Sequence, residues 1–225
     1  GQYVFISSAS AYAKPPAGTY VTEGTLLRNP YWEYSRNKIA CEERLIEAWR
    51  DTGFPITIVR PSHTYGDKMI PSIFDGGATI VNRILNGKKV IVPGDGTNRW
   101  TLTHNSDFGK GFTGWLGNPA AIGESFHITS DEALTWDQIH QIIGIKLGRP
   151  VEIVHMPADY ICSRYQEFTG PLKGDKIHTA LFDNTKIKRM VPAFRCTTPF
   201  NIGVEASLSR LQDHPEENVI DEDLN

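Results

Sequence analysis

The pattern of apolar positions predicts alternating strands and helices at the beginning of the chain. Short apolar runs at residues 3–6 and 56–59 have the length and composition of buried parallel strands. Between them, apolar residues recur at helical spacing from Trp32 to about Arg50, and Gly53 is expected to end this helix. The strand–helix–strand order favours a parallel crossover, which is right-handed in nearly all proteins.

The same alternation continues over the rest of the chain. Further strands are expected at 90–92, 126–128 and 151–154. Further helices are expected at 73–85, from a cap at Asp107 to Trp115, at 136–147 after a cap at Thr135, from Pro157, and at 199–211. The segment 9–30 has the composition of a loop, and the acidic tail 214–225 is expected to be disordered.

Composition is that of an ordinary soluble domain and argues against two classes of partner. Hydrophobic residues make up 40% of the 225 positions and charged residues 22%, which suits one large domain or one domain with a small cap. The net charge is −3 and there is no basic stripe, which argues against a nucleic-acid partner. No apolar run is long enough to cross a membrane, so we expect no membrane partner and a cytoplasmic protein.

Cysteine usage agrees with that location. Cys41, Cys162 and Cys196 are odd in number and widely spaced, as expected of free thiols in a reducing compartment. There is no Cys-x-x-Cys motif and no cluster of histidines and cysteines. The sequence therefore predicts neither a disulfide framework nor a metal site.

The candidate chemistry lies in a tyrosine and a lysine that are four residues apart. Tyr34 and Lys38 would share one face of the helix after the first strand, and Ser8 follows that strand directly. A free phenol has a pKa near ~10, and a nearby cation lowers it toward the working range. The three groups together predict a proton-transfer site for oxidising an alcohol or reducing a carbonyl. Taken alone, a tyrosine and a lysine at this spacing are more often two solvated residues on a helix. The surrounding sequence therefore decides whether they form a proton-transfer site.

That context is a series of short sequence motifs whose order and spacing match those of one known family. The first blocks are Phe5-Ile-Ser-Ser-Ala-Ser-Ala-Tyr12, Glu23, Pro30, Tyr34-Ser-Arg-Asn-Lys38 and Glu42. The later blocks are Arg60-Pro-Ser-His-Thr-Tyr-Gly66, Pro93-Gly-Asp-Gly96, Phe126-His-Ile-Thr129 and Phe182-Asp-Asn-Thr-Lys186. They cover nearly the whole chain, which resembles the extended short-chain dehydrogenase/reductase family and, within it, the NAD-dependent epimerase/dehydratase group.

The resemblance implies an α/β fold in two parts. Residues 1–66 and part of 100–130 would be the remainder of a Rossmann-type domain with a parallel sheet. Residues 67–99 and 131–213 would form a smaller C-terminal α/β substrate-binding portion. The chain matches about the last two thirds of such an enzyme, so the N-terminal half-domain with its glycine-rich phosphate loop is expected to be absent. The fragment alone would then be inactive, and its parent protein would be the enzyme.

The resemblance also implies roles for the candidate residues. Tyr34 would be the catalytic acid/base, Lys38 would bind the nicotinamide ribose and lower the tyrosine pKa, and Ser8 would bond the reacting oxygen. The cofactor would be NAD or NADP, contacted by Ser7, Tyr34, Lys38, Pro61 and His63. Substrate contacts are expected from Ser10, His63 and Arg99.

Two departures from the family's pattern bear on the reaction. Ala9 and Ser10 follow Ser8 where the family's dehydratases and decarboxylases carry acidic residues, which disfavours elimination and leaves this run closer to that of the 4-epimerases. Trp100 stands where many members have an arginine that clamps a diphosphate, and Arg99 lies one position early. The expected substrate is sugar-like or nucleotide-sugar-like, and the displaced arginine argues against the nucleotide.

Several functions stay open at this point. An epimerase and a ketone or aldehyde reductase of the same family would use the same residues. A non-catalytic binding or regulatory protein on this scaffold is a further alternative, although Tyr34 and Lys38 are both present, which favours an enzyme. Members of the family often form homodimers through the tyrosine-bearing helix, where Trp32 or Trp49 could take part.

Overall fold

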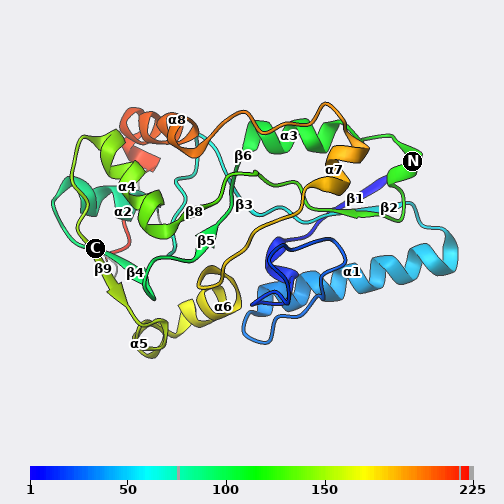
Figure 1. Ribbon diagram of the computed structural model, residues 1–225, viewed down its shortest axis with the longest axis horizontal. Helices are drawn as coiled ribbons and strands as arrows, with labels where there is room; N and C mark the ends of the chain where they lie inside the picture. Colours follow the sequence, from blue (N-terminus) through cyan, green and yellow to red (C-terminus); the bar gives the residue numbers. More distant parts are fainter. Residues whose placement is uncertain (75–76, 218, 223–225) are drawn as a thin grey trace.

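The fold begins with a three-stranded parallel sheet in the order β1–β2–β7 (Figure 1). The computed structural model describes residues 1–74, 77–217 and 219–222. The strands of this sheet are β1 (Tyr3–Ile6), β2 (Ile56–Val59) and β7 (Ser125–Phe126). β2 pairs with β1 on one side and with β7 on the other. Because β1 and β2 are parallel, their carboxyl ends meet at one edge of the sheet.

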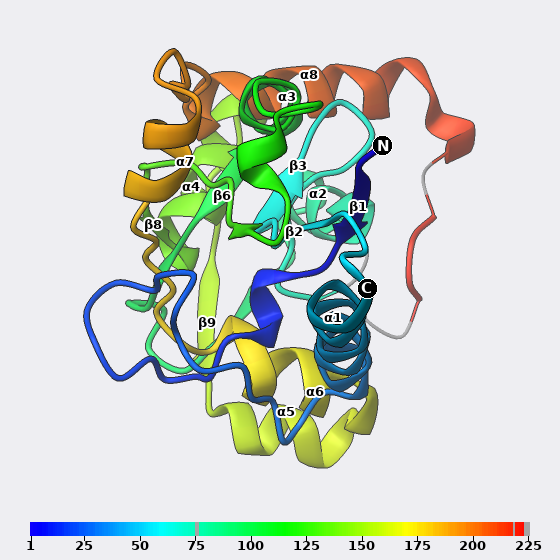
Figure 2. The same ribbon diagram turned by 90° about the vertical axis from the view of Figure 1, so that its right-hand side faces the viewer.

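Helix α1 (Glu33–Thr52) connects β1 to β2 and lies against one face of the sheet (Figures 1 and 2). Helices α3 (Asn105–Thr113) and α7 (Thr185–Met190) lie on the other face. Gly53 ends α1 with φ of 72°, a left-handed conformation that glycine adopts without the strain a Cβ would bring. The predicted strand–helix–strand unit with parallel strands is confirmed.

The other described strands form three two-stranded sheets. They are the parallel pair β3 (His63–Tyr65) and β6 (Leu102–His104), the parallel pair β4 (Val90–Pro93) and β9 (Ile153–Met156), and the antiparallel pair β5 (Arg99–Trp100) and β8 (Leu134–Thr135). The helices around them are α2 (Gly77–Leu85), α4 (Trp136–Leu147), α5 (Ala158–Arg164), α6 (Thr169–Pro171) and α8 (Phe200–Asp213). Short helical turns lie at Ala9–Ala11, Pro119–Ala121, Gln166–Phe168 and Leu172–Lys176. The expected division into a Rossmann remainder and a substrate-binding portion stays a prediction.

Helix α4 has the ends that the sequence predicts. Thr135 and Gln138 form a reciprocal capping box, and Gly148 ends the helix with φ of 64°. The strand expected at 126–128 is shorter, because β7 ends at Phe126.

The predicted helix cap at Asp107 is wrong. His104 caps α3, and its ring nitrogen accepts a hydrogen bond from the Ser106 amide. Asp107 lies inside the first turn, where its carboxylate accepts bonds from the amides of Thr197 and Thr198 at 3.0 and 2.8 Å. Asp107 therefore binds the segment that leads into α8, a contact that local sequence does not reveal.

Part of the acidic tail is held against the fold, contrary to the expected disorder. Residues Pro215–Glu217 form a short helical turn. The amide of Asp221 donates to Thr79 Oγ1 on α2 at 2.9 Å, which ties the tail to that helix. Residues 218 and 223–225 of the predicted tail, and 75–76 of the helix predicted at 73–85, lie outside the described residues.

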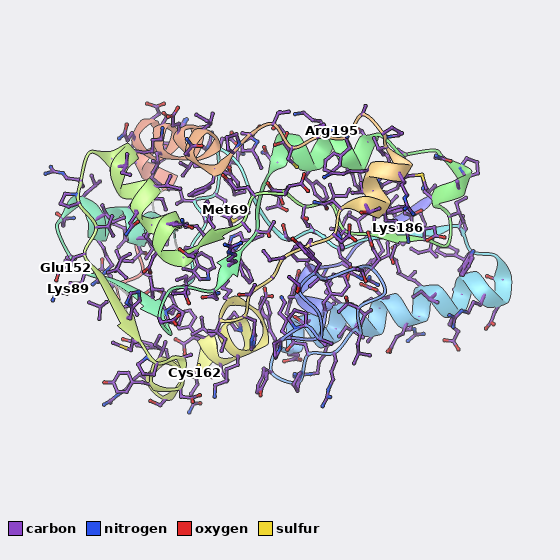
Figure 3. All side chains as sticks on the ribbon, in the orientation of Figure 1. Met69, Lys89, Glu152, Cys162, Lys186 and Arg195 are labelled. Carbon is purple, nitrogen blue, oxygen red and sulfur yellow. The ribbon has the colours of Figure 1, made fainter. Side chains whose placement is uncertain are left out.

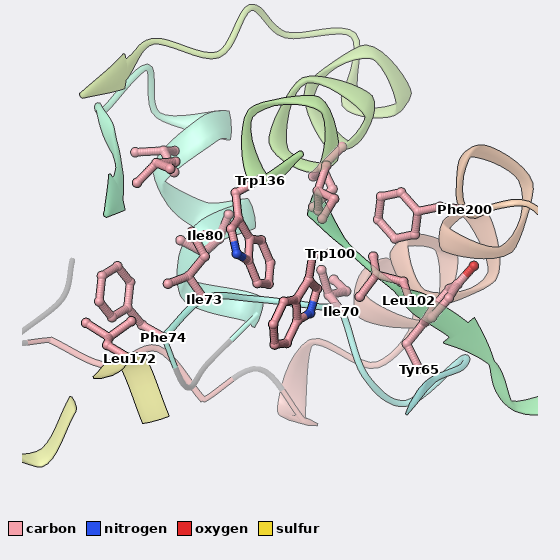
Figure 4. Packing of buried hydrophobic residues seen from close by; sticks show 14 of the residues in the cluster. Tyr65, Ile70, Ile73, Phe74, Ile80, Trp100, Leu102, Trp136, Leu172 and Phe200 are labelled. Carbon is pink, nitrogen blue, oxygen red and sulfur yellow. The ribbon is translucent and has the colours of Figure 1, made fainter. Parts of the chain in front are cut away.

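Two clusters of buried apolar side chains form the core. The smaller cluster surrounds the three-stranded sheet and includes Trp115 and Phe126, whose rings stack at 5.9 Å. The larger cluster lies among the remaining elements, where Trp100 of β5 stacks on Trp136 of α4 at 5.5 Å (Figure 4). Packing of the larger cluster therefore fixes the position of Trp100.

The three cysteines are free thiols, as predicted. Cys162 is buried on α5 (Figure 3). Cys41 is exposed on α1. No helix among the described residues combines the length and the apolar character that a bilayer crossing requires.

Stability is expected to fall as the pH drops below about 6.5, because a buried histidine stays neutral in the fold. His140 is fully buried on α4, and burial lowers its pKa from 6.5 to about 4. The unfolded chain takes up a proton at this histidine before the folded chain does. Each pH unit between these two values therefore removes about 1.4 kcal/mol from the free energy of unfolding.

Replacing His140 by phenylalanine is expected to make the decrease in the free energy of unfolding between pH 6.5 and pH 5 smaller. Urea unfolding at both pH values measures this decrease. His155→Phe is the matched control, because the His155 side chain is 42% exposed. Equal pH slopes for wild type and His140→Phe would contradict the prediction.

Candidate active site

Three serine hydroxyls form a hydrogen-bonded chain at the end of β1. Ser35 Oγ, buried on α1, donates to Ser10 Oγ at 2.7 Å, and Ser10 Oγ lies 2.8 Å from Ser8 Oγ. The Ser10 amide also donates to Ser8 Oγ at 3.2 Å. With Ser10 donating to Ser8, the Ser8 hydroxyl keeps its own proton for another acceptor. This order suits a serine that donates to a substrate oxygen.

Tyr34 and Lys38 lie close together on α1, as their spacing predicts. Lys38 Nζ is 5.5 Å from the centroid of the Tyr34 ring and donates to the Ile6 carbonyl at 2.9 Å. Ile6 is the last residue of β1, so this bond holds the ammonium at the strand end. Tyr34 is 45% exposed, which leaves its phenol accessible to a bound molecule.

A cavity of about 370 Å³ brings five of the predicted site residues together. These residues are Ser8, Ser10, Tyr34, Pro61 and His63. The wall also includes Trp32, Trp100 and Met69, and Met69 lies near the middle of the molecule (Figure 3). A cavity of this size accepts a small organic molecule.

Three other predicted residues lie outside the lining of this cavity. Lys38 binds Ile6 at the strand end. Ser7 is buried after β1, and its Oγ has no hydrogen-bond partner among the described residues. Arg99 is exposed on β5, where its amide donates to Thr179 Oγ1. A substrate contact by Arg99 stays a prediction that the cavity geometry does not favour.

His63 is a neutral group in the cavity wall. Burial lowers its pKa to about 3, and the charge of Lys176 contributes in the same direction. Trp100 Nε1 donates to His63 Nδ1 at 3.4 Å, which leaves the ring proton on Nε2. His63 can therefore offer an uncharged hydrogen-bond donor to a ligand.

Lys14 and Asp175 form an ion pair in the wall of the same cavity. Both side chains are largely buried, at 3% and 13% exposed. Lys14 Nζ also lies 5.5 Å from the centroid of the Trp100 ring. Burial lowers the pKa of Lys14 to about 7, whereas the neighbouring carboxylate favours its charged form.

A buried polar network ties α1 to the end of β2. Arg60 Nε donates to both carboxylate oxygens of Glu42 at 2.9 and 3.1 Å, and Arg60 Nη1 donates to the Tyr12 hydroxyl at 3.1 Å. Burial raises the pKa of Tyr12 to about 12, so its phenol stays protonated and can donate to His127 Nδ1 at 3.2 Å. This network fixes the strand end that precedes Pro61.

The sequence pattern does not identify Lys14, Asp175 or Ser35 as parts of the site. Lys14 and Asp175 come from distant segments, and only packing of the loop after Tyr12 against the turn Leu172–Lys176 joins them. Ser35 directly follows Tyr34, and helical geometry turns neighbouring residues to different faces, so the spacing that places Tyr34 beside Lys38 does not point to Ser35.

Comparison with known proteins gives a family model and several relatives. The model described as the NAD dependent epimerase/dehydratase family matches residues 1–129. The 2'-dehydrokanamycin reductase of Streptomyces kanamyceticus is 29% identical over 197 residues, which are 85% of this chain and 54% of that protein. An uncharacterized UDP-glucose epimerase of Bacillus subtilis is 31% identical over 148 residues, 65% of this chain and 45% of that protein. The chain thus spans about half the length of these curated relatives.

Solved structures share the fold. The UDP-glucuronic acid 4-epimerase of Bacillus cereus, solved with UDP-glucuronic acid and NAD, matches with a TM-score of 0.76. The two sequences are 21% identical, and the match covers 94% of this chain and 62% of the other. This likeness confirms the predicted α/β, Rossmann-type fold class. Whether the parent protein carries the half-domain with the phosphate loop stays a prediction.

Proposed function

Because the chain belongs to the NAD-dependent epimerase/dehydratase family, we propose that its parent protein is an NAD(P)-dependent epimerase or oxidoreductase acting on a sugar-like substrate. The observation that carries the proposal is the cavity lined by Ser8 and Tyr34, with Lys38 beside the tyrosine ring. The names of two relatives, a dehydrokanamycin reductase and a UDP-glucose epimerase, support the two reactions. Both reactions require proton transfer at a substrate oxygen.

In the proposed reaction Tyr34 moves the proton and Ser8 orients the oxygen. The substrate oxygen accepts a hydrogen bond from Ser8 and exchanges a proton with Tyr34 Oη. Lys38 places its positive charge 5.5 Å from the centre of the Tyr34 ring. Bound NAD or NADP supplies the hydride exchange at the substrate carbon. Ala9 and Ser10 provide no carboxylic acid for a leaving hydroxyl, which favours epimerisation or reduction over elimination.

The residues at the carboxyl ends of β1 and β2 fit a nicotinamide cofactor. Ser7 Oγ is buried there without a partner among the described residues, and a buried hydroxyl normally has one. Lys38 Nζ makes one hydrogen bond to Ile6, and an ammonium has three donors, so it can also bind ribose hydroxyls. Pro61 lies in the cavity wall after β2, where it can pack on the nicotinamide ring.

Three further expectations belong to this proposal. Residues 1–66 with part of 100–130 would hold the cofactor, and 67–99 with 131–213 would hold the substrate. A homodimer through α1 would use Trp49, which is 36% exposed, rather than Trp32, which lines the cavity. The protein would work in the cytoplasm, with free cysteines.

The full-length protein is the sample that tests the proposal, since this chain spans about half the length of the curated relatives. A reductase would consume NADH or NADPH in stoichiometric amounts with a phosphate-free keto sugar. An epimerase would interconvert UDP-glucose and its 4-epimer without net change in the cofactor. In one sample, nicotinamide absorbance measures consumption of the cofactor, and NMR measures conversion of the sugar. If the protein binds the dinucleotide but catalyses neither reaction, the proposal is contradicted.

A further inference from the structure

The cavity has aromatic walls contributed by two separate parts of the chain. Trp32 and Tyr34 lie together at the start of α1, with 5.0 Å between their ring centroids. Trp100 enters the wall from β5, backed by the stacked ring of Trp136 (Figure 4). Such rings provide broad apolar surface with a polar edge, as small-molecule sites commonly do. They suit an uncharged ring with polar substituents.

The two lysines in the wall are already bound by the protein. Lys14 pairs with Asp175. Lys176 Nζ donates to the carbonyls of Ser72 and Ile73 at 3.3 and 2.6 Å. Both ammonium groups therefore share their donors with the protein, and the described lining of the cavity contains no arginine, the side chain whose paired donors match a phosphate best. A diphosphate would meet the Asp175 carboxylate and no guanidinium of the described lining, which argues against a phosphate-bearing ligand in this cavity.

We propose that this site takes a phosphate-free sugar or amino sugar and that Asp175 recognises one of its hydroxyl or amino groups. The inference rests on the proposed function and narrows its substrate class. The ion pair with Lys14, which itself lies against Trp100, holds the Asp175 carboxylate as a fixed acceptor. An amino group on the sugar would add a charge-assisted hydrogen bond. Asp175 is thus a specificity-determining residue.

Binding of three probes to the full-length protein tests the inference separately from turnover. Saturation-transfer NMR with glucosamine, glucose and UDP-glucose reports which parts of each molecule touch the protein. We expect saturable binding of glucosamine and glucose. UDP-glucose should bind at least about tenfold more weakly, since the loss of the charge-assisted hydrogen bond to Asp175 alone is worth about that factor. Asp175→Asn is expected to weaken glucosamine by about tenfold and glucose less, because the amide keeps the shape but loses the charge.

Asp159→Asn is the matched control, since Asp159 pairs with Lys173 on the surface and its side chain is 87% exposed. It should bind all three probes as the wild type does. Tighter binding of UDP-glucose with saturation of its uridine protons, no binding of either phosphate-free sugar, or unchanged glucosamine binding in Asp175→Asn would overturn the inference. The order of the three probe affinities for the wild-type protein tests the inference even if the Asp175→Asn variant fails to fold. Because binding requires no proton transfer, an inactive protein with the expected ranking would count against the proposed reaction only.

Discussion

Replacing Tyr34 by phenylalanine is expected to lower kcat of the full-length protein by about 10²–10⁴-fold, the usual contribution of a positioned acid or base. Phenylalanine keeps the ring that packs on Trp32 and loses only the phenol oxygen. Affinity for the dinucleotide should change little, since Lys38 and its bond to Ile6 remain. Single-turnover measurement of nicotinamide absorbance, with a sugar that the wild type converts, gives the rate of the chemical step.

Tyr31→Phe is the control for that experiment. Tyr31 lies just before α1, is 52% exposed, and lies outside the cavity lining. Its replacement should leave kcat unchanged. A Tyr34→Phe variant that binds the dinucleotide and turns over at the wild-type rate would remove Tyr34 from the proposed reaction, whatever the substrate.

Replacing Glu42 by alanine is expected to reduce the free energy of unfolding by about 3–5 kcal/mol, because it leaves a buried guanidinium without its carboxylate. Glu42 is fully buried on α1, and Arg60 is 3% exposed at the end of β2. Three hydrogen bonds join the two side chains. Urea unfolding at neutral pH measures the loss.

Two further variants make this prediction specific. Glu43→Ala removes the neighbouring exposed carboxylate and should change stability by less than about 0.5 kcal/mol. Glu42→Leu combined with Arg60→Met should recover part of the loss, because no unpaired charge is left in the core. A loss in Glu42→Ala no larger than that in Glu43→Ala would show that Arg60 finds another partner.

The first strand–helix–strand unit of the fold is readable from local patterns. The apolar runs at 3–6 and 56–59 are β1 and β2, and the helical spacing between them is α1, ended by Gly53 as predicted. The pattern is clear because each run is short, apolar and bounded by residues that break regular structure. The expected burial is confirmed for β2 and wrong for β1, where Tyr3 and Ile6 are exposed. The two-residue strands β5 and β8 carry no such signal, since their pairing depends on segments far apart in sequence.

The case of Asp107 shows why local signals also mislead. An aspartate before a helical stretch is a common cap, yet here its carboxylate binds the amides of Thr197 and Thr198. A buried carboxylate accepts from whichever donors the fold brings near, and these come from a distant segment. The acidic tail gives a second example, because its charge predicts disorder while the Asp221 amide bonds to Thr79.

The sequence alone determined the strand–helix–strand unit and the placement of Tyr34 beside Lys38, because both depend on spacing between residues that are close along the chain. It also predicted the free cysteines, from their odd number and wide separation. Tertiary structure alone decided what faces the candidate site. Lys14 meets Asp175, Trp100 stacks on Trp136, and Arg99 lies outside the cavity lining. These contacts join segments that are distant along the chain, and burial fixes them because an unpaired charge or a void in the core costs stability.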